Sequence, residues 1–157
     1  MPDARSRVGI VGGTGAVGRV TLELLAARGY EHVRVFASAR SAGSSVPFGD
    51  GRLTVEEATP EALAAGDVDV FLFSVGTSAS KELVPHAVRG GALVVDKSSA
   101  YRLVDGYPLV GPQLPGLYTV VTHSGITLAP HLAGLVAQEV HGRPAEALEP
   151  YRPGSRG

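Results

Sequence analysis

The sequence predicts an α/β protein in which a mostly parallel sheet is covered by helices on both faces. Short, almost uninterrupted apolar runs occur at Arg7–Val11, Val68–Val75 and Ala92–Asp96, as is typical of strands buried on both sides. Stretches with apolar residues at helical spacing separate these runs. The 157 residues, 44% of them hydrophobic, are enough to bury a sizeable core. Strand and helix therefore alternate along the chain, as they do in parallel sheets.

The first strand, Arg7–Val11, leads through a glycine-dense turn into a helix that we expect at Val17–Arg28. Gly29 follows the last helical residue and is expected to end the helix. Apolar residues recur in this stretch at helical spacing, so we expect them to form the face that packs on the core. These residues are Val17, Val20, Leu24 and Leu25.

The middle of the chain continues the alternation. Helices are expected at Pro60–Ala65, where proline suits the first position, and at Lys81–Arg89. Pro85 would be tolerated in the second helix only within about the first turn, because proline has no N–H to donate. The composition of Ser38–Pro47 indicates a polar loop. The remaining strands are expected at His32–Ala37, at Leu53–Glu56, and centrally at Val68–Val75.

After Arg102 the character of the sequence changes. We expect a proline-punctuated connector from Tyr107 to Pro112, then a strand, a helix with Pro130 in its first turn, and a loosely held tail. The last three segments are Leu117–Thr122, Leu128–Val140 and Gly142–Gly157. The chain is therefore expected to divide into an α/β domain, residues 1–102, and a strand–helix segment with a Pro/Gly-rich tail, residues 103–157.

Composition argues against several classes of partner and chemistry. A net charge of −1 gives no reason to expect nucleic acid or an anionic membrane as partner. No apolar run approaches the roughly 20 residues that span a bilayer, and the N-terminus resembles no signal peptide, so a cytoplasmic protein is expected. The chain has no cysteine and its five histidines lack paired spacing, so we predict no disulfide, no metal site and no thiol nucleophile. No catalytic residue is predicted.

The turn after the first strand carries the pattern of a dinucleotide site. Gly12 would allow a tight turn, Gly15 a close approach of a pyrophosphate, and Gly18 close packing of helix on strand. The helix N-terminus would offer free N–H groups and a positive dipole end to the phosphates. The first hundred residues therefore resemble a Rossmann-type domain, the alternative being a glycine-rich turn without a ligand.

The residues after the second strand favour NADP over NAD. NAD-selective sites carry an acidic residue about 20 positions past the glycines, to bind the ribose 2′-hydroxyl. Here Ser38, Arg40 and Ser41 occupy that place without a carboxylate. Two hydroxyls and a guanidinium suit a 2′-phosphate, whereas FAD also prefers an acid there. The alternative is a solvated polar loop.

Four segments, Val8–Gly18, Phe36–Gly43, Phe71–Gly76 and Val94–Arg102, together resemble the N-terminal NADP-binding domain of aspartate-β-semialdehyde dehydrogenase. The resemblance covers about residues 7–102 and implies reduction of β-aspartyl phosphate to the semialdehyde with NADPH, in lysine, threonine and methionine synthesis. The resemblance implies that the pyrophosphate is contacted by Thr14, Gly15, Ala16 and Val17, and that the 2′-phosphate is held by Ser38, Arg40 and Ser41. It also implies that Gly76 lies near the nicotinamide ribose and that Arg102 binds the phosphate of the substrate.

The chain departs from this family in two ways. The family usually has Asn where Lys97 stands. The family's second domain supplies a cysteine nucleophile and a histidine acid/base, and no such domain follows Arg102. The resemblance thus implies an NADP-binding domain that is not catalytically competent alone, and implies a complementing catalytic domain or a homo-oligomer as partner.

The C-terminal part, about residues 102–157, resembles the C-terminal end of FAD-dependent glycine/D-amino-acid oxidases. The segments that carry this resemblance are Asp105–Pro112, His123–Pro130 and the Tyr151-Arg-Pro sequence. The chain thus reads as two oxidoreductase pieces joined near Tyr101–Asp105. Three alternatives to the dehydrogenase domain stay open: an oxidase fragment that binds FAD, a non-catalytic NADP-binding module, and a non-functional composite whose second piece does not dock.

Overall fold

The computed structural model describes residues 5–101, 110–114, 117–120, 133–139 and 141–151. The chain divides into two compact units at the Ala100–Tyr101 peptide. We describe each unit by itself, beginning with the N-terminal one.

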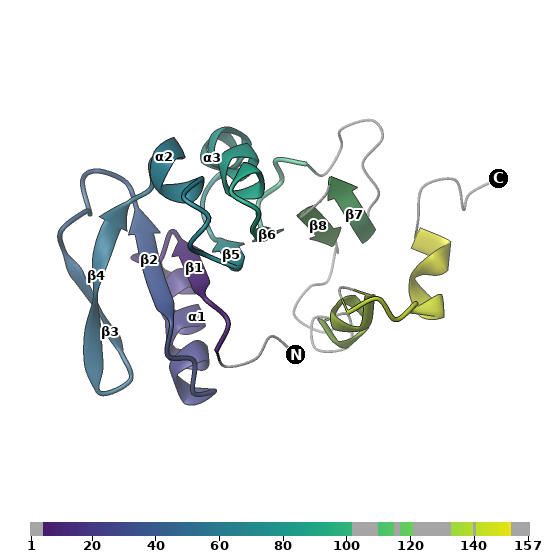
Figure 1. The fold of residues 1–157 in the computed structure, drawn as a ribbon, viewed down its shortest axis with the longest axis horizontal. Helices are drawn as coiled ribbons and strands as arrows, with labels where there is room; N and C mark the ends of the chain where they lie inside the picture. The colour runs from purple at the N-terminus through teal and green to yellow at the C-terminus, as the bar shows by residue number, and fades with distance from the viewer. Residues whose placement is uncertain (1–4, 102–109, 115–116, 121–132, 140, 152–157) are drawn as a thin grey trace. The chain divides into compact units, whose positions relative to one another are not determined.

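The N-terminal unit is a six-stranded sheet with strand order β3-β4-β2-β1-β5-β6 (Figure 1). Neighbouring strands β4, β2, β1, β5 and β6 run parallel, and β3 pairs antiparallel with β4 at the sheet's edge. β1 is central, with Val8 opposite Val33 of β2 on one side and Val70 of β5 on the other. The strands are β1 (Val8–Val11), β2 (Val33–Ala37), β3 (Ser45–Phe48), β4 (Gly51–Glu57), β5 (Val70–Phe73) and β6 (Leu93–Asp96).

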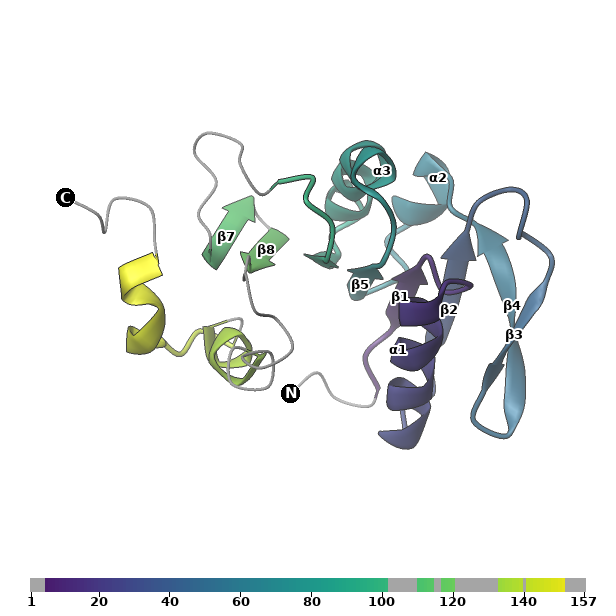
Figure 2. The same ribbon diagram turned by 180° about the vertical axis from the view of Figure 1, so that it is seen from behind.

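Helices cover both faces of this sheet. α1 (Ala16–Ala27) connects β1 to β2, and α3 (Thr77–Arg89) connects β5 to β6. The chain moves away from β1 in opposite directions in these two crossovers, so right-handed connections place the helices on opposite faces. α1 accordingly lies behind the strands in Figure 1 and in front of them in Figure 2, while the short α2 (Pro60–Leu63) packs against α3. The predicted Rossmann-type α/β class is confirmed.

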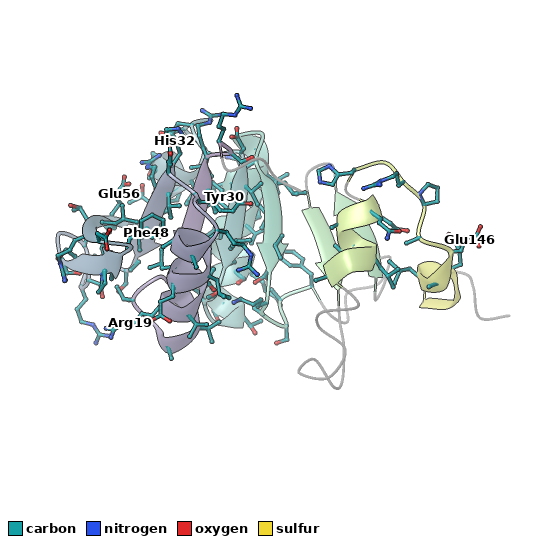
Figure 3. The ribbon with its side chains drawn as sticks, turned by 90° about the horizontal axis from the view of Figure 1, so that it is seen from below. Arg19, Tyr30, His32, Phe48, Glu56 and Glu146 are labelled. Atoms are coloured by element: carbon teal, nitrogen blue, oxygen red, sulfur yellow. The ribbon has the colours of Figure 1, made fainter. Side chains whose placement is uncertain are left out.

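The core lies between the sheet and its helices. Ile10, Val35 and Phe36 have no exposed surface, and each such side chain contributes about 1.5–3 kcal/mol by burial. The ring centroids of Phe36 and Phe71 are 5.6 Å apart in a tilted contact. Partly buried Tyr30 and Phe48 pack against the α1 side of the core, and Figure 3 shows both side chains next to α1.

The predicted inner face of α1 is confirmed for Leu25, which packs against the core, and is wrong for the other three residues. Val17, Val20 and Leu24 are respectively 56%, 53% and 49% exposed, whereas Gly18 and Leu22 are buried. A β-carbon on Gly18 would collide with the carbonyl oxygen of Gly12 and lie 2.6 Å from the Gly13 α-carbon. That close contact fixes the rotation of the helix, because Leu22 and Leu25 follow Gly18 at helical spacing and turn inward with it.

Two further expectations for this unit are corrected. The polar loop predicted at Ser38–Pro47 contains the start of β3, whose alternating Val46 and Phe48 pack on the core while Ser45 and Pro47 stay exposed. Pro85 lies in the ninth position of α3, well past the first turn. Its exposed position in α3 lets water hydrate the carbonyl that lacks an N–H partner. The apolar face predicted there is confirmed for Leu83, Val84 and Ala87, which are buried.

Ionic contacts tie the strands together at the sheet's surface. Arg34 of β2 forms a bidentate pair with Glu56 of β4, with Nε–Oε1 and Nη2–Oε2 distances of 2.8 and 2.6 Å, and also contacts Asp67. The Arg7 side chain and backbone both donate to Asp69, which lowers the pKa of that carboxyl below its usual value. Both pairs join segments that are distant in the sequence.

The C-terminal unit contains a β-hairpin, a helix and a 3₁₀ turn. β7 (Val110–Leu114) pairs antiparallel with β8 (Leu117–Val120), so part of the predicted connector is a strand. The helix predicted at Leu128–Val140 is described at 133–139, and Pro130 lies outside the described residues. The tail, predicted to be loosely held, is packed at Ala145, just before the 3₁₀ helix η1 (Glu146–Tyr151), and at Leu148 within it. These two residues are 3% and 1% exposed and pack against Leu135 and Val136. This contact orders the tail as far as η1.

Among the described helices none is long and apolar enough to cross a membrane. The described residues also contain no group of three or more acidic, histidine or cysteine side chains placed to hold a metal ion.

Candidate functional site

A cleft of about 410 Å³ opens in the N-terminal unit where β1, β2, β4 and β5 end. Segments from four strand ends and from α3 meet there because parallel strands present their carboxyl ends at the same edge of the sheet. The residues that line it are Val11, Gly12, Thr14, Gly15, Ala37, Ser38, Ala58, Ser74, Val75, Ala79, Glu82 and Leu83. Such an edge is where open α/β sheets bind their ligands.

The glycine turn forms the floor of this cleft. Gly12 has a φ of +89°, and a β-carbon there would lie 2.5 Å from the carbonyl oxygen of Ser74. Its N–H donates to the carbonyl of Phe36 at 2.8 Å, which joins the turn to β2. A β-carbon on Gly15, in contrast, would meet only the Gly12 carbonyl oxygen, at 3.4 Å. The protein therefore leaves no room for a side chain at Gly12. Gly15 has open space beside it, where a ligand could approach the backbone.

The start of α1 suits an anion. Gly15 is the N-cap, no side chain caps the helix, and the first turn carries no acidic residue. The first N–H groups of a helix have no partner within it, so those of Ala16, Val17 and Gly18 keep their donors for a ligand. The Ser74 hydroxyl in the wall of the cleft is buried and has no hydrogen-bond partner among the described residues. These features fit the phosphates of a dinucleotide.

The turn after β2 presents Ser38, Arg40 and Ser41. It is closed by hydrogen bonds from the Ser41 N–H to the Ser38 carbonyl, at 2.8 Å, and from the Ser44 hydroxyl to the Ser41 carbonyl, at 2.6 Å. Ser38 lines the cleft, Ser38 and Arg40 are exposed, and Ser41 is half-buried. No described carboxylate pairs with Arg40. A guanidinium and hydroxyls thus lie beside the cleft, with no acid in the turn.

The ends of β5 and β6 carry the other predicted positions. Gly76 is the N-cap of α3 and follows Val75 of the cleft wall. Asp96, the last residue of β6, accepts hydrogen bonds from the fully buried Ser80 hydroxyl, at 3.0 Å, and from the N–H and hydroxyl of Ser98. Lys97 lies beside this network, and partial burial lowers the pKa of its ammonium group below the ordinary value. Arg102 lies outside the described residues.

The structure therefore brings together Gly12, Thr14, Gly15 and Ser38 in one cleft, whereas the other described positions are not among the residues that line it. Sequence motifs did not identify Ala58, Ala79, Glu82 and Leu83, which complete the walls. Ala79, Glu82 and Leu83 lie on one face of α3, and their helical spacing in the sequence could have shown that they share a face. Their position opposite β2 and β4, however, depends on the order of strands in the sheet.

Comparison with known proteins shows similarity to semialdehyde dehydrogenases. The family described as semialdehyde dehydrogenase, NAD binding domain, matches residues 7–117. The aspartate-semialdehyde dehydrogenase of Bacillus subtilis is 39% identical over 147 residues, which are 92% of this chain and 40% of that protein. The Corynebacterium glutamicum enzyme of the same name is 45% identical over 108 residues, 66% of this chain and 31% of that protein. This chain thus spans less than half the length of these relatives.

Solved structures show the same relationship. Aspartate semialdehyde dehydrogenase II of Vibrio cholerae, complexed with ASA, is 27% identical with a TM-score of 0.66, over 83% of this chain and 47% of that one. A Rex-family repressor in complex with NAD⁺ and operator DNA has a TM-score of 0.54 at 12% identity, over 88% of this chain and 60% of that one, so it shares the fold alone.

These comparisons extend the dehydrogenase resemblance beyond its predicted end at residue 102. The family match continues to residue 117, into the segment for which the sequence predicted a resemblance to an FAD-dependent oxidase. The relatives named above are dehydrogenases and do not support that prediction. The Bacillus subtilis similarity covers most of the chain. The most specific oxidase-like segment, His123–Pro130, lies outside the described residues.

Proposed function

This chain belongs to the semialdehyde dehydrogenase NAD-binding domain family, and from that premise we propose that it binds NADP(H) for an aspartate-semialdehyde-dehydrogenase-like oxidoreductase. The reaction would be the reduction of β-aspartyl phosphate to the semialdehyde. The observation that carries the choice of cofactor is the turn after β2, where Arg40 lies between Ser38 and Ser41 with no carboxylate in the turn. A Candida albicans member of the enzyme class, 20% identical and similar in fold, was solved with NADP.

Each part of the cofactor would be held by a different part of the cleft. Thr14, Gly15, Ala16 and Val17 would bind the pyrophosphate through the backbone at the start of α1. Ser38, Arg40 and Ser41 would bind the 2′-phosphate by charge-assisted hydrogen bonds. Gly76 would lie by the nicotinamide ribose, and Arg102 would bind the phosphate of the substrate. When bound, the cofactor supplies the hydride.

The chain's own residues would bind and orient the cofactor but would not form a covalent intermediate. Thiolate chemistry requires a cysteine, and the sequence contains none. The catalytic groups would therefore come from another domain or chain, and a complementing catalytic domain or a homo-oligomer is the proposed partner. The absence of cysteine equally favours a second candidate, a module that binds NADP(H) without catalysis.

Titration of the full chain with NADPH, NADH and FAD tests the cofactor assignment. We expect NADPH to bind more tightly than NADH, because only NADPH offers a phosphate to Arg40. Arg40→Ala should weaken NADPH binding by about 1.5–3 kcal/mol, roughly 10- to 150-fold, and leave NADH binding unchanged. Fluorescence of the bound nicotinamide or calorimetry measures both affinities.

Arg89→Ala provides the matched control, because Arg89 is an exposed arginine in the last turn of α3, away from the residues that line the cleft. It should leave both affinities as they are. Equal affinity of the original chain for NADH and NADPH would contradict the assignment. Tight binding of FAD would favour the oxidase alternative instead.

A further inference from the structure

The cleft has one ionisable side chain among its described lining residues, Glu82 of α3. Apolar residues line the same cleft: Ala79 and Leu83 of the same helix, and Ala37 and Ala58 at the ends of β2 and β4. Glu82 is exposed, and its carboxylate makes no hydrogen bond or ion pair with another described residue. This carboxylate is therefore available to a ligand in the cleft.

A negative charge is unfavourable in a cleft built for phosphates. Like charges at short range repel, and the partly water-excluded wall of a cleft screens them less than bulk water does. The start of α1 carries no acidic residue, and neither does the turn at Ser38–Ser41. Beside a bound dinucleotide, a carboxylate at Glu82 is therefore most favourable where the ligand presents a hydrogen-bond donor.

The order of groups in a dinucleotide identifies that donor. Under the proposed function, the pyrophosphate lies at the start of α1 and the 2′-phosphate at the Ser38–Ser41 turn. The adenosine ribose links these two groups, so the adenine extends into the remaining part of the cleft, by Ala58 and α3. Adenine has two apolar faces and an exocyclic amino group that donates hydrogen bonds. Alanine and leucine side chains fit the faces, and a carboxylate fits the amino group.

We infer that Glu82 is a specificity residue that accepts a hydrogen bond from the exocyclic amino group of adenine, and so selects adenine dinucleotides. A hypoxanthine or guanine base has a carbonyl oxygen at the same ring position. That oxygen would face the carboxylate as acceptor against acceptor, which costs binding because neither group is satisfied. The inference rests on the proposed function, since it requires the dinucleotide to occupy this cleft.

The test compares NADPH with its deaminated analogue, reduced nicotinamide hypoxanthine dinucleotide phosphate, on the full chain. The unmodified chain should bind NADPH about tenfold or more tightly than the analogue. Glu82→Gln should reduce this preference to within about threefold, because a side-chain amide can accept from adenine or donate to hypoxanthine. Its preference for NADPH over NADH should persist, since the 2′-phosphate turn is unchanged.

Glu23→Gln, an exposed position on α1 outside the cleft, is the matched control and should keep the preference of the unmodified chain. Far-ultraviolet circular dichroism checks that each variant is folded. Equal binding of the two dinucleotides by the unmodified chain, with NADPH still preferred over NADH, overturns this inference but leaves the proposed function intact. An unchanged adenine preference in Glu82→Gln also overturns it. Failure to bind either dinucleotide overturns both proposals.

Discussion

Three glycines of one turn serve different physical purposes. Gly12 adopts a φ of +89° and approaches the Ser74 carbonyl, so it needs both a left-handed backbone and the absence of a side chain. Gly18 packs against the backbone of Gly12 and Gly13. Gly15 has an ordinary φ of −76° and an open side. Its lack of a side chain therefore matters for what approaches from outside.

This difference predicts opposite outcomes for two alanine variants. Gly15→Ala should keep the fold, with a loss of about 1 kcal/mol or less at the N-cap, but should sharply weaken NADPH binding because the new methyl group occupies the pyrophosphate approach. Gly18→Ala should destabilise the fold by about 1–3 kcal/mol, because its methyl group has only backbone to displace. Urea unfolding and NADPH titration separate the two effects. A Gly15→Ala variant that binds as the unmodified chain does would contradict the pyrophosphate assignment.

At the residue scale, the sequence predicted the cleft residues that lie in the turns after strands, but not those in the walls of the cleft. Gly12, Thr14, Gly15 and Ser38 follow directly after strands, and their spacing along the chain is enough to place them. Glu82 lies in the second turn of a helix that follows a different strand. Its position in the cleft depends on β5 lying next to β1, and the order of strands is a tertiary property.

At the scale of elements, α1 shows how a single contact outweighs periodicity. Its apolar residues extend around much of the helix, so both the Val17–Val20–Leu24 set and the Gly18–Leu22–Leu25 set satisfy helical spacing. The contact of Gly18 with the turn after β1 selects the second set. Short elements were missed for a related reason, because the four-residue β3 contains a proline and gains its order from pairing with β4.

The rotation of α1 can be tested with one substitution at two positions. Leu22 is 1% exposed and Leu24 is 49% exposed. Leu22→Ala should therefore cost about 2–5 kcal/mol in the free energy of unfolding, whereas Leu24→Ala should cost about 1 kcal/mol or less. Denaturant unfolding of both variants measures the difference. A larger cost for Leu24→Ala than for Leu22→Ala would mean that the helix is turned as its spacing alone predicted.

At the scale of the whole molecule, the chain combines a cleft that we propose to bind NADP(H) with a sequence that has no cysteine. We therefore expect the protein to bind NADPH without catalysing its oxidation. NADPH at about 100 times its dissociation constant should stabilise the protein by about 2.7 kcal/mol and raise its unfolding temperature. NADPH together with β-aspartyl phosphate should give no oxidation of the nicotinamide, measured by its absorbance.

The Arg40→Ala variant serves as the control for this experiment, since it should lose most of the stabilisation by NADPH. Oxidation of NADPH in proportion to the concentration of pure protein would contradict the proposal that catalytic groups come from elsewhere. The proposal would be supported if NADPH stabilised the protein without being oxidised, and if addition of a cysteine-bearing partner domain then gave oxidation of NADPH.

The edge strand β3 has a consequence for how molecules of this protein meet in solution. The hairpin to β4 turns through two residues, so Phe48 and Gly51 close the ladder and Pro47, opposite Arg52, turns its nitrogen outward. A strand from a neighbouring molecule would need a donor at that point, and a proline ring stands there instead. The Arg52 guanidinium also engages the Ser45 carbonyl, at 2.9 Å. This margin of the sheet is thereby a poor template for self-association into extended aggregates.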